Sequence, residues 1–435
     1  MPKLSAIILA AVLLIPCSGW AFRAQFGLSP DNSRALLLNS IQDAKKTIII
    51  NIYQFDEAEV LNALLGKISD KVSIRILVEG EPFGQISPEG KKALSKLQQA
   101  MKASKKSGHR LYVMTSKAGG KRRYRFNHAK YVITDDTRAL ISSENFTANG
   151  FPKAGKKGNR GWQVLLESAP IVSQLNQIFA TDTDVSKGDI IDLLKVNSDG
   201  SSNGPDTPFS GIESDRLAPA LSSETGDVSS ATLIAAPNSL PGLVSFIRSA
   251  EKSVALEFMS LPATWKSGGE SQSALVKELV AAASRGADVR VLLNDESVFG
   301  NPPGFLPENL LGNADAKKGN EITVEYLNQL ALCKHLSIEA KIVDIKAVEI
   351  TYIHNKGLIV DGKRVLVSSI NGTRNSVMDN REIAVALESS DAADYYGRAF
   401  SFDWSKSASK IKTENCLSQN PITEIMGWQT MPFLQ

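Results

Sequence analysis

One pattern of residues occurs twice in this 435-residue chain, with the same internal spacing in both copies. Each copy reads HxKxxxxD and then SSxN. Because a single accidental HxKxxxxD is already rare, two copies with the same tail are not expected by chance. The chain is therefore predicted to contain two copies of one folding unit. The repeated residues are His128, Lys130, Asp135, Ser142, Ser143 and Asn145 in the first copy, and His354, Lys356, Asp361, Ser368, Ser369 and Asn371 in the second.

Weaker matches extend the repeat on both sides of the two motifs. Upstream, residues 75–78 match residues 290–293. Downstream, the matched pairs are Asn159-Arg160 with Asn380-Arg381, Phe179 with Phe400, and Asp182 with Asp403. The offset between matched residues changes along the chain, which indicates loops of different length between the matched elements.

Both halves have the same order of expected elements, in which helices alternate with apolar strands. This alternation predicts an α/β fold, with helices packed on a largely buried sheet. We expect helices at 33–45, 57–69, 240–250 and 272–285, and strands at 47–53, 72–78, 124–134, 138–142, 253–259 and 288–293.

The domain boundaries follow from the repeat and from composition. We expect a signal peptide at 1–21, a first repeat at 22–190, a linker at 191–230, a second repeat at 231–412 and a tail at 413–435. The linker is dense in Ser, Gly, Pro and Asp, a composition typical of flexible connections. The signal peptide is expected because Lys3 precedes the apolar run 6–15 and Ala21 ends a small-residue cleavage site. This predicts a secreted or periplasmic protein, with an uncleaved N-terminal membrane anchor as the alternative.

Cleavage at Ala21 would leave two cysteines, Cys333 and Cys416. In an oxidising compartment they are expected to form one disulfide. Neither these cysteines nor the four histidines have metal-ligand spacing, so we expect no metal and no other cofactor. The net charge of +3 is too small to identify a partner, so basic character that matters has to be local.

The repeated residues suit chemistry on an anionic phosphodiester. If the two halves face each other across a pseudo-twofold axis, both His-Lys pairs converge on one site. The lysines would then stabilise oxyanion charge in the transition state. One imidazole could attack phosphorus to form a phosphohistidine, while the other protonates the leaving oxygen and then activates water or an alcohol.

This pair of motifs resembles the phospholipase D superfamily, in which the second group is usually GSxN. The resemblance implies two pseudo-symmetric α/β sandwich halves, with mixed sheets flanked by helices and the active site between them. It further implies mainly structural roles for Asp135 and Asp361, and we expect Ser143 and Ser369 to help bind the phosphate. The catalytic residues implied by the resemblance are His128, Lys130, Asn145, His354, Lys356 and Asn371.

The two halves differ at a position that matters in this family. In the second half Glu382 follows Asn380-Arg381, whereas Gly161 stands at the matching position of the first half. In similar proteins this carboxylate orients a catalytic imidazole, so one histidine is expected to lack its partner. If Glu382 serves the opposite half, it holds His128 as the nucleophile and leaves His354 free as acid and base.

The motif does not identify the substrate, and three functions remain open. The first is a phospholipase D that releases phosphatidic acid and a head group, with membrane-surface association favoured by the apolar stretch 298–311. The second is an extracytoplasmic nuclease, and the third is a non-catalytic binding module. A nuclease is suggested because basic residues interleaved with aromatic ones suit single-stranded nucleic acid as well as lipid head groups. We expect a monomer that is an internal pseudo-dimer, without an obligate protein partner. The basic candidates for substrate binding are Lys121, Arg122, Arg123 and Arg125.

Overall fold

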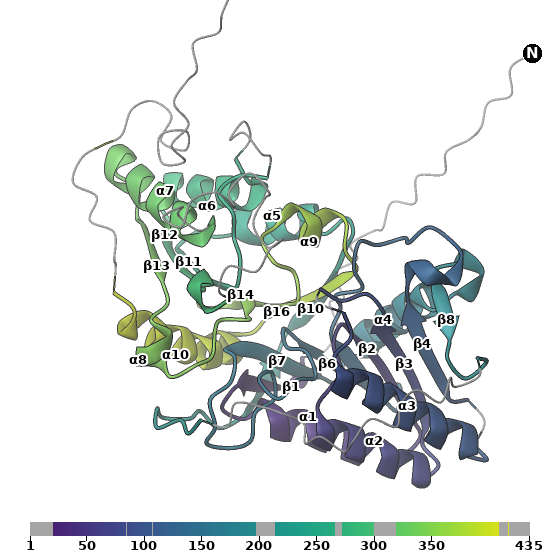
Figure 1. Ribbon diagram of the computed structural model, residues 1–435. Coiled ribbons are helices and arrows are strands. Elements are labelled where there is room, and N and C mark those ends of the chain that lie inside the picture. Colours follow the sequence, from purple (N-terminus) through teal and green to yellow (C-terminus); the bar gives the residue numbers. More distant parts are fainter. Residues whose placement is uncertain are drawn as a thin grey trace, which may run out of the picture.

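The computed structural model describes residues 21–83, 85–106, 108–196, 214–265, 272–299, 319–408 and 416. It contains two mixed β-sheets, one for each half of the chain, which pack against each other (Figure 1). The first sheet has nine strands in the order β8-β4-β3-β2-β5-β6-β7-β1-β9. The second has seven in the order β10-β16-β15-β14-β11-β12-β13. The predicted α/β class with two pseudo-symmetric halves is confirmed.

The first sheet and its helices have the following bounds: β1 Phe22–Ser29, α1 Ser33–Asp43, β2 Thr47–Ile52, α2 Ala58–Ser69, β3 Ser73–Glu79, α3 Pro88–Ala103, β4 Arg110–Met114, β5 Tyr131–Thr134, β6 Arg138–Ser142, β7 Gly161–Leu166, α4 Ala169–Asp182, β8 Ile190–Asp192 and β9 Glu224–Val228. The second sheet and its helices comprise β10 Ser230–Ala236, α5 Leu240–Arg248, β11 Ser253–Phe258, α6 Ala274–Ser284, β12 Asp288–Leu293, α7 Gly319–Lys334, β13 Ile338–Ile342, α8 Ile345–Val348, β14 Lys356–Val360, β15 Arg364–Ser368, α9 Arg374–Met378, β16 Glu382–Glu388 and α10 Ser390–Lys406.

Strand pairing repeats the same plan in both halves. Strand β2 pairs parallel with β3 and antiparallel with β5. Its counterpart β11 pairs parallel with β12 and antiparallel with β14. Local sequence supports these elements: α3, for example, begins at Pro88, and the Ser87 hydroxyl before it accepts a hydrogen bond from the Gly90 amide. Proline at the first helical position and serine at the cap are both favourable there.

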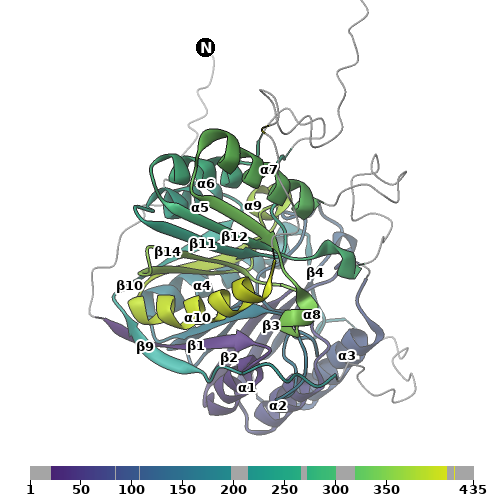
Figure 2. The same cartoon turned by 90° about the vertical axis from the view of Figure 1, so that its left-hand side faces the viewer.

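The two sheets share one hydrophobic core, which fixes the relative position of the halves. Helices α1, α2 and α3 cover the outer face of the first sheet, and α5, α6 and α7 cover that of the second (Figure 1). The inner faces meet in a cluster that combines residues such as Ile141 and Val164 with Val367 and Val385. Helix α10 contacts β14 and β15 of its own half and β1 and β9 of the other, and Figure 2 shows it lying between β14 and β1. Burial of apolar surface at this interface stabilises the pseudo-dimer.

Two predicted elements differ from the structure. The strand expected at 124–134 begins only at Tyr131, so the prediction is wrong for residues 124–130. The physical reason is that this segment bonds to the other half: the Arg125 amide donates to the Asp379 carbonyl oxygen. Strand β9, at residues 224–228, lies within the expected linker 191–230 and pairs antiparallel with β1 at the edge of the first sheet.

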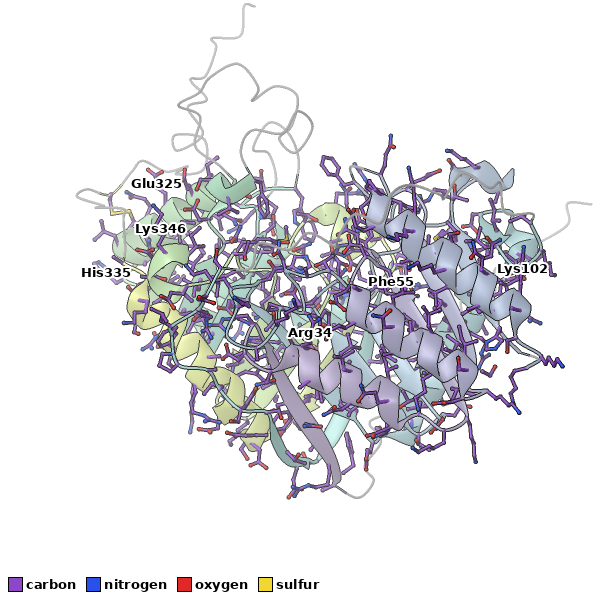
Figure 3. The ribbon with its side chains drawn as sticks, turned by 60° about the horizontal axis from the view of Figure 1, so that its bottom comes forward. Arg34, Phe55, Lys102, Glu325, His335 and Lys346 are labelled. Atoms are coloured by element: carbon purple, nitrogen blue, oxygen red, sulfur yellow. A yellow bond between two sulfur atoms is a disulfide. The ribbon has the colours of Figure 1, made fainter. Side chains whose placement is uncertain are left out.

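The second half is joined to the tail by the expected disulfide. Cys333 in α7 is bonded to Cys416, with 5.3 Å between their Cα atoms. Figure 3 shows neighbouring His335 at the edge of the second half, away from the first. Most of the expected signal peptide and tail, and residues 300–311 of the apolar stretch, lie outside the described residues. Within the described ranges, no helix is long and apolar enough to cross a membrane.

Candidate active site

Each motif histidine is hydrogen-bonded through its backbone to the opposite half of the molecule. The His128 amide donates to the Arg381 carbonyl oxygen at 2.8 Å, and the His354 amide donates to the Arg160 carbonyl oxygen at 2.9 Å. The two motifs therefore meet across the interface between the halves. A single site between them can be built from both histidines and both lysines.

The two arginines that accept these hydrogen bonds are fixed by reciprocal buried ion pairs. The Arg160 guanidinium of the first half donates to both carboxylate oxygens of Asp403 at 2.6 and 2.9 Å. The Arg381 guanidinium of the second half lies 2.9 Å from the Asp182 carboxylate. These four residues are the downstream matches of the sequence repeat, so the structure explains why they match: each pair ties one half to the other.

The His128 ring is held by a carboxylate from the second half. Its Nδ1 lies 2.8 Å from Oε2 of Glu382. Glu382 also accepts hydrogen bonds from the hydroxyls of Ser369 at 2.7 Å and Ser376 at 2.5 Å, and from the Asn380 amide at 3.0 Å. Burial opposes its ionisation, but His128 and these donors outweigh that effect and the pKa of Glu382 lies below its usual value. An ionised Glu382 fixes the proton of His128 on Nδ1 and leaves the Nε2 electron pair available.

His354 also has a carboxylate partner, so the expectation that it lacks one is wrong. Its Nδ1 lies 3.1 Å from Oε2 of Glu144, the variable residue of the first SSxN group. The Asn159 amide donates to the same oxygen at 3.0 Å. Gly161 makes room for this side chain, because a Cβ atom there would lie 2.0 Å from Oε1 of Glu144. The sequence contained this signal: a glutamate inside the motif and a glycine where the family has a carboxylate.

Both motif lysines are almost completely buried beside their histidines. The Lys130 ammonium donates to the His128 carbonyl oxygen at 2.8 Å, and the Lys356 ammonium donates to the His354 carbonyl oxygen at 2.5 Å. Burial lowers the pKa of Lys130 to about 7 and that of Lys356 to about 8. An anionic ligand would raise both values again, because it stabilises the ammonium form.

The electrostatics of the site keep both imidazoles neutral. Burial lowers the pKa of His128 to about 4, in spite of the nearby Glu382 carboxylate. Burial also places the pKa of His354 well below its usual value, and the charges of Lys356 and Lys130 lower it further. These mutual effects mean that the four groups sense one another's charge. Across the described residues, no cluster of His, Cys, Asp and Glu side chains could hold a metal ion.

The asparagines of the SSxN groups lie at the same site. The Asn145 amide nitrogen donates to Oε1 of Gln54 at 3.1 Å. The side-chain oxygens of Asn145 and Asn371 are buried and have no hydrogen-bond partner within the described part of the chain. The hydroxyls of Ser143 and Ser369 accept from the backbone amides of Trp162 and Ile383 and thereby join neighbouring strands. Their expected contact with a phosphate remains a prediction.

The carboxylates of the motif aspartates accept hydrogen bonds from backbone amides and do not contact the histidines. The Asp135 carboxylate accepts hydrogen bonds from the three consecutive amides of residues 45–47, at the start of β2. The Asp361 carboxylate accepts from the amides of residues 251–253, at the start of β11. Each aspartate thus connects the hairpin after its motif to the neighbouring strand.

Two of the four basic candidates are occupied by internal carboxylates. The Arg122 guanidinium donates to Glu79 at 2.8 Å and to Glu81 at 3.0 Å. The Arg123 guanidinium forms an ion pair with Asp189 at 2.8 Å. These contacts give both arginines a structural part in the fold. Exposed Lys121 and Arg125 line a cavity of about 390 Å³, together with Pro237, Met378 and others.

Aromatic rings flank both motif histidines, and the sequence analysis did not predict them. The Tyr53 ring meets the His128 ring edge-on, with centroids 4.6 Å apart. On the other side the Tyr352 ring meets the His354 ring edge-on at 5.7 Å. Tyr352 stands two positions before His354, a signal that was available in the sequence, whereas Tyr53 is distant from His128 in the sequence and no motif marks it. A further aromatic ring contacts each of these tyrosines: Phe126 contacts Tyr53, and Phe299 contacts Tyr352.

The fold and site define a class of duplicated α/β proteins in which two His-Lys-carboxylate sets share one interface. The sequence profile described as "Cardiolipin synthase, PLD-like domain" matches residues 37–183 and 243–404. The chain therefore belongs to the phospholipase D-like family, whose enzymes act on phosphodiesters.

Solved structures agree at the level of the fold. The chain is similar to phosphatidylserine synthase of Haemophilus influenzae Rd KW20, with a TM-score of 0.62 and 12% identity over 92% of each chain. It is also similar to Nuc of Salmonella typhimurium, a phospholipase D family member, with 21% identity and a TM-score of 0.31 over 42% of this chain and 98% of that one. No curated protein matches the chain.

Proposed function

We propose that this protein is a phospholipase D-type phosphodiesterase that cleaves a phospholipid to phosphatidic acid and a free head group. The same site would transfer the phosphatidyl group to an alcohol when one replaces water. The observation that carries this proposal is the pair of complete His-Lys-carboxylate sets at one interface. Such a site offers a nucleophile, an acid and base, and two cations for one anionic diester.

In the proposed cycle, Nε2 of His128 attacks phosphorus and the bond to the head-group oxygen breaks. His354 supplies the proton for that oxygen, and Lys130 and Lys356 stabilise the charge on the phosphoryl oxygens. Water then gives a proton to His354 while its oxygen attacks phosphorus. The N–P bond breaks, phosphatidic acid leaves, and His128 returns to its neutral form.

His128 is assigned as the nucleophile because of its carboxylate. Attack through Nε2 leaves a cationic ring that carries a proton on Nδ1, and the ionised Glu382 at 2.8 Å stabilises that charge. His354 has a carboxylate with fewer hydrogen-bond donors, so a cationic ring is less stabilised there. The assignment is tested by trapping the intermediate, and label on His354 would reverse it.

A lipid substrate is favoured by apolar side chains around the site. The Phe83 amide donates to the hydroxyl of Tyr53, whose ring contacts His128, and the Phe83 side chain is 50% exposed. Met378, which is 37% exposed, lies at the cavity beside Arg125. Exposed apolar groups next to a phosphate site suit acyl chains or the interfacial region of a bilayer. We also propose export of the protein, with β1 beginning at Phe22, directly after the expected cleavage site.

A nuclease is the second candidate, since Lys121 and Arg125 give the cavity near the site a positive rim. One experiment separates the candidates. The protein without residues 1–21 is incubated with vesicles of phosphatidylcholine and phosphatidylglycerol, with and without ethanol, and separately with single-stranded DNA. Head-group release, with phosphatidylethanol when ethanol is present, supports the proposal. Nucleotide release alone would make the protein a nuclease, and neither product would indicate a binding module. The variant His128→Ala is the control for each substrate.

A further inference from the structure

The two catalytic histidines receive their carboxylates from different places in the repeat. His128 is held by Glu382, at the first residue of β16. His354 is held by Glu144, which lies after β6 and inside the SSxN group. In the second half, the residue that matches Glu144 is Ile370, with 1% of its surface exposed. The carboxylate has therefore changed position in one half only.

This change required Gly161 as well as Glu144. At Gly161, any Cβ atom would lie within 2.0 to 2.7 Å of the Glu144 carboxylate and its Cγ. Real Cβ atoms do not approach other atoms so closely, so a side chain there would displace Glu144 from His354. Glu144 and Gly161 thus form one unit, and neither substitution works without the other.

The two carboxylates differ in how many donors surround them. Glu382 accepts four hydrogen bonds, from His128, two hydroxyls and one amide. Glu144 is fully buried; among the residues that the structure describes, His354 and Asn159 are the hydrogen-bond partners of its Oε2, and its Oε1 has none. The charged and titratable groups that face Glu144 are His354, Lys356, Lys130 and Tyr352. A buried carboxylate with few donors favours its neutral form.

Electrostatics create a difficulty that such a neutral carboxyl would solve. His354 is expected to give a proton to the leaving oxygen, yet burial and the charges of Lys356 and Lys130 disfavour its imidazolium form. Burial raises the pKa of Glu144 to about 8, in spite of the Asn159 amide and the two lysines. At neutral pH the proton of the pair therefore resides on the carboxyl group rather than making the ring cationic.

We propose that Glu144, accommodated by Gly161, is the positioning residue of His354 and relays a proton through it. In the free enzyme Oε2 of Glu144 donates to Nδ1 of His354, whose Nε2 carries the ring proton. As the leaving oxygen takes the Nε2 proton, Nδ1 takes the Glu144 proton, and the pair becomes carboxylate and neutral imidazole. When water later gives a proton to Nε2, the Nδ1 proton returns to Glu144. The imidazolium form is never needed.

This inference rests on the proposed function, and its test separates the two. The chain has four histidines, so nitrogen-15 NMR can follow the His354 ring directly, whether or not a substrate is turned over. In the unmodified protein we expect the Nε2–H tautomer of His354 and the Nδ1–H tautomer of His128. Glu144→Gln should change the pH titration of the His354 nitrogens, while exposed Glu167→Gln, the matched control, should not. A His354 spectrum that Glu144→Gln leaves unchanged would overturn the relay even if the enzyme is active.

Kinetics with two leaving groups give the second readout. Glu144→Gln should lower kcat about 10²- to 10³-fold for an alkyl head group, as expected for loss of acid catalysis. It should change the rate of the p-nitrophenolate burst less than about threefold for a p-nitrophenyl ester, whose oxygen needs no proton to leave. Because the relay requires protonated Glu144, kcat/KM should fall as pH rises through about 8; Lys130 and Lys356 lose their charge in the same range, so the limb should become shallower in the variant rather than disappear. Equal losses for both leaving groups would contradict the relay and leave the phosphodiesterase proposal intact.

Two variants with a substitution at Gly161 distinguish loss of the relay from loss of activity through misfolding. Gly161→Ala should reproduce the Glu144→Gln phenotype, because its Cβ displaces the carboxylate. The double variant Glu144→Ile/Gly161→Glu copies the arrangement of the second half, whose carboxylate is ionised, so it should fold with the original stability yet keep the low alkyl-ester kcat of Glu144→Gln. Recovery of alkyl-ester activity to within about tenfold of the original would show that an ionised carboxylate on His354 is sufficient and would overturn the relay.

Discussion

The reciprocal buried ion pairs make a stability prediction that distinguishes the two halves. Asp403 forms a bidentate pair with Arg160, and the side chains are 0% and 1% exposed. Removing one partner of such a buried pair costs about 3–5 kcal/mol of unfolding free energy, because the other charge stays uncompensated. Asp182→Asn should cost this amount, since no other carboxylate of the described residues pairs with Arg381.

Asp403→Asn should cost less, because two further carboxyls lie close to Arg160: Asp31, which is 3.8 Å away and shared with Arg216, and Glu257. Glu257 is fully buried on β11, and burial together with the negative charge of Asp403 keeps its pKa well above the usual value. When Asp403 loses its charge, Glu257 can ionise and replace it opposite Arg160. The first half has Asn51 at the corresponding position in β2, so it has no carboxyl group at that position that could ionise in the same way.

A double-mutant cycle measures the effect by equilibrium urea unfolding at pH 7. Glu257→Gln alone should cost about 1 kcal/mol or less, since Glu257 is already neutral. Combined with Asp403→Asn, the loss should exceed the sum of the single losses by about 1–3 kcal/mol. Additive losses, within about 0.5 kcal/mol, would refute the idea that Glu257 takes over the charge.

Three further predictions concern the roles of other residues. In His354→Ala, a p-nitrophenyl phosphodiester should give a burst of about one p-nitrophenolate per protein and a phosphorylated His128, because departure needs no acid; the absence of both would remove the assigned roles. Asp361→Asn should lower the unfolding free energy by about 1.5–3 kcal/mol relative to exposed Asp227→Asn. Burial opposes ionisation of Asp361, but its backbone donors outweigh this and lower its pKa, so its contribution is present above the unfolded pKa and should vanish as pH falls through the folded value. Thiol titration of the denatured, unreduced protein should find neither Cys333 nor Cys416 free, whereas two thiols per chain would contradict the disulfide; Cys416→Ser opens a separation of 83 residues and should cost about 4 kcal/mol.

Much of the fold could be predicted because the same order of helices and strands is expected in both halves of the chain, so each half supports the prediction for the other. Helices and strands were predicted within a few residues wherever apolar periodicity was strong, as for α2 and β12. The segment before β5 could not be placed, because its hydrogen bonds go to Asp379 and Arg381 of the other half. Strand β9 was missed because it has only five residues, most of them polar or glycine, and it depends on β1 for pairing.

The residues of the candidate site could be predicted where a motif specifies them. The prediction failed where a side chain is positioned by the room that another residue leaves for it. His128 and Glu382 are far apart in the sequence, yet the family pattern linked them before their 2.8 Å contact was known. Glu144 was not predicted as a partner because the third position of SSxN differs between the two copies, with Glu144 in one and Ile370 in the other. Only the geometry around Gly161 reveals that this position reaches His354.

The two halves differ around the pseudo-twofold axis in the positions of three buried carboxyl groups, and all three differences affect the charge near the histidines. A duplicated site with perfect symmetry would give both histidines the same proton affinity, and a nucleophile and an acid need different ones. Glu382 has many donors and stays ionised, whereas Glu144 has few and stays neutral. Glu257, whose equivalent in the first half is Asn51, adds a second neutral carboxyl on the His354 side. There the His354 amide donates to the Arg160 carbonyl oxygen. In the proposed cycle, the shared plan of the halves therefore places the two histidines at one site, and the substitutions that break the plan give them the different proton affinities that a nucleophile and an acid require.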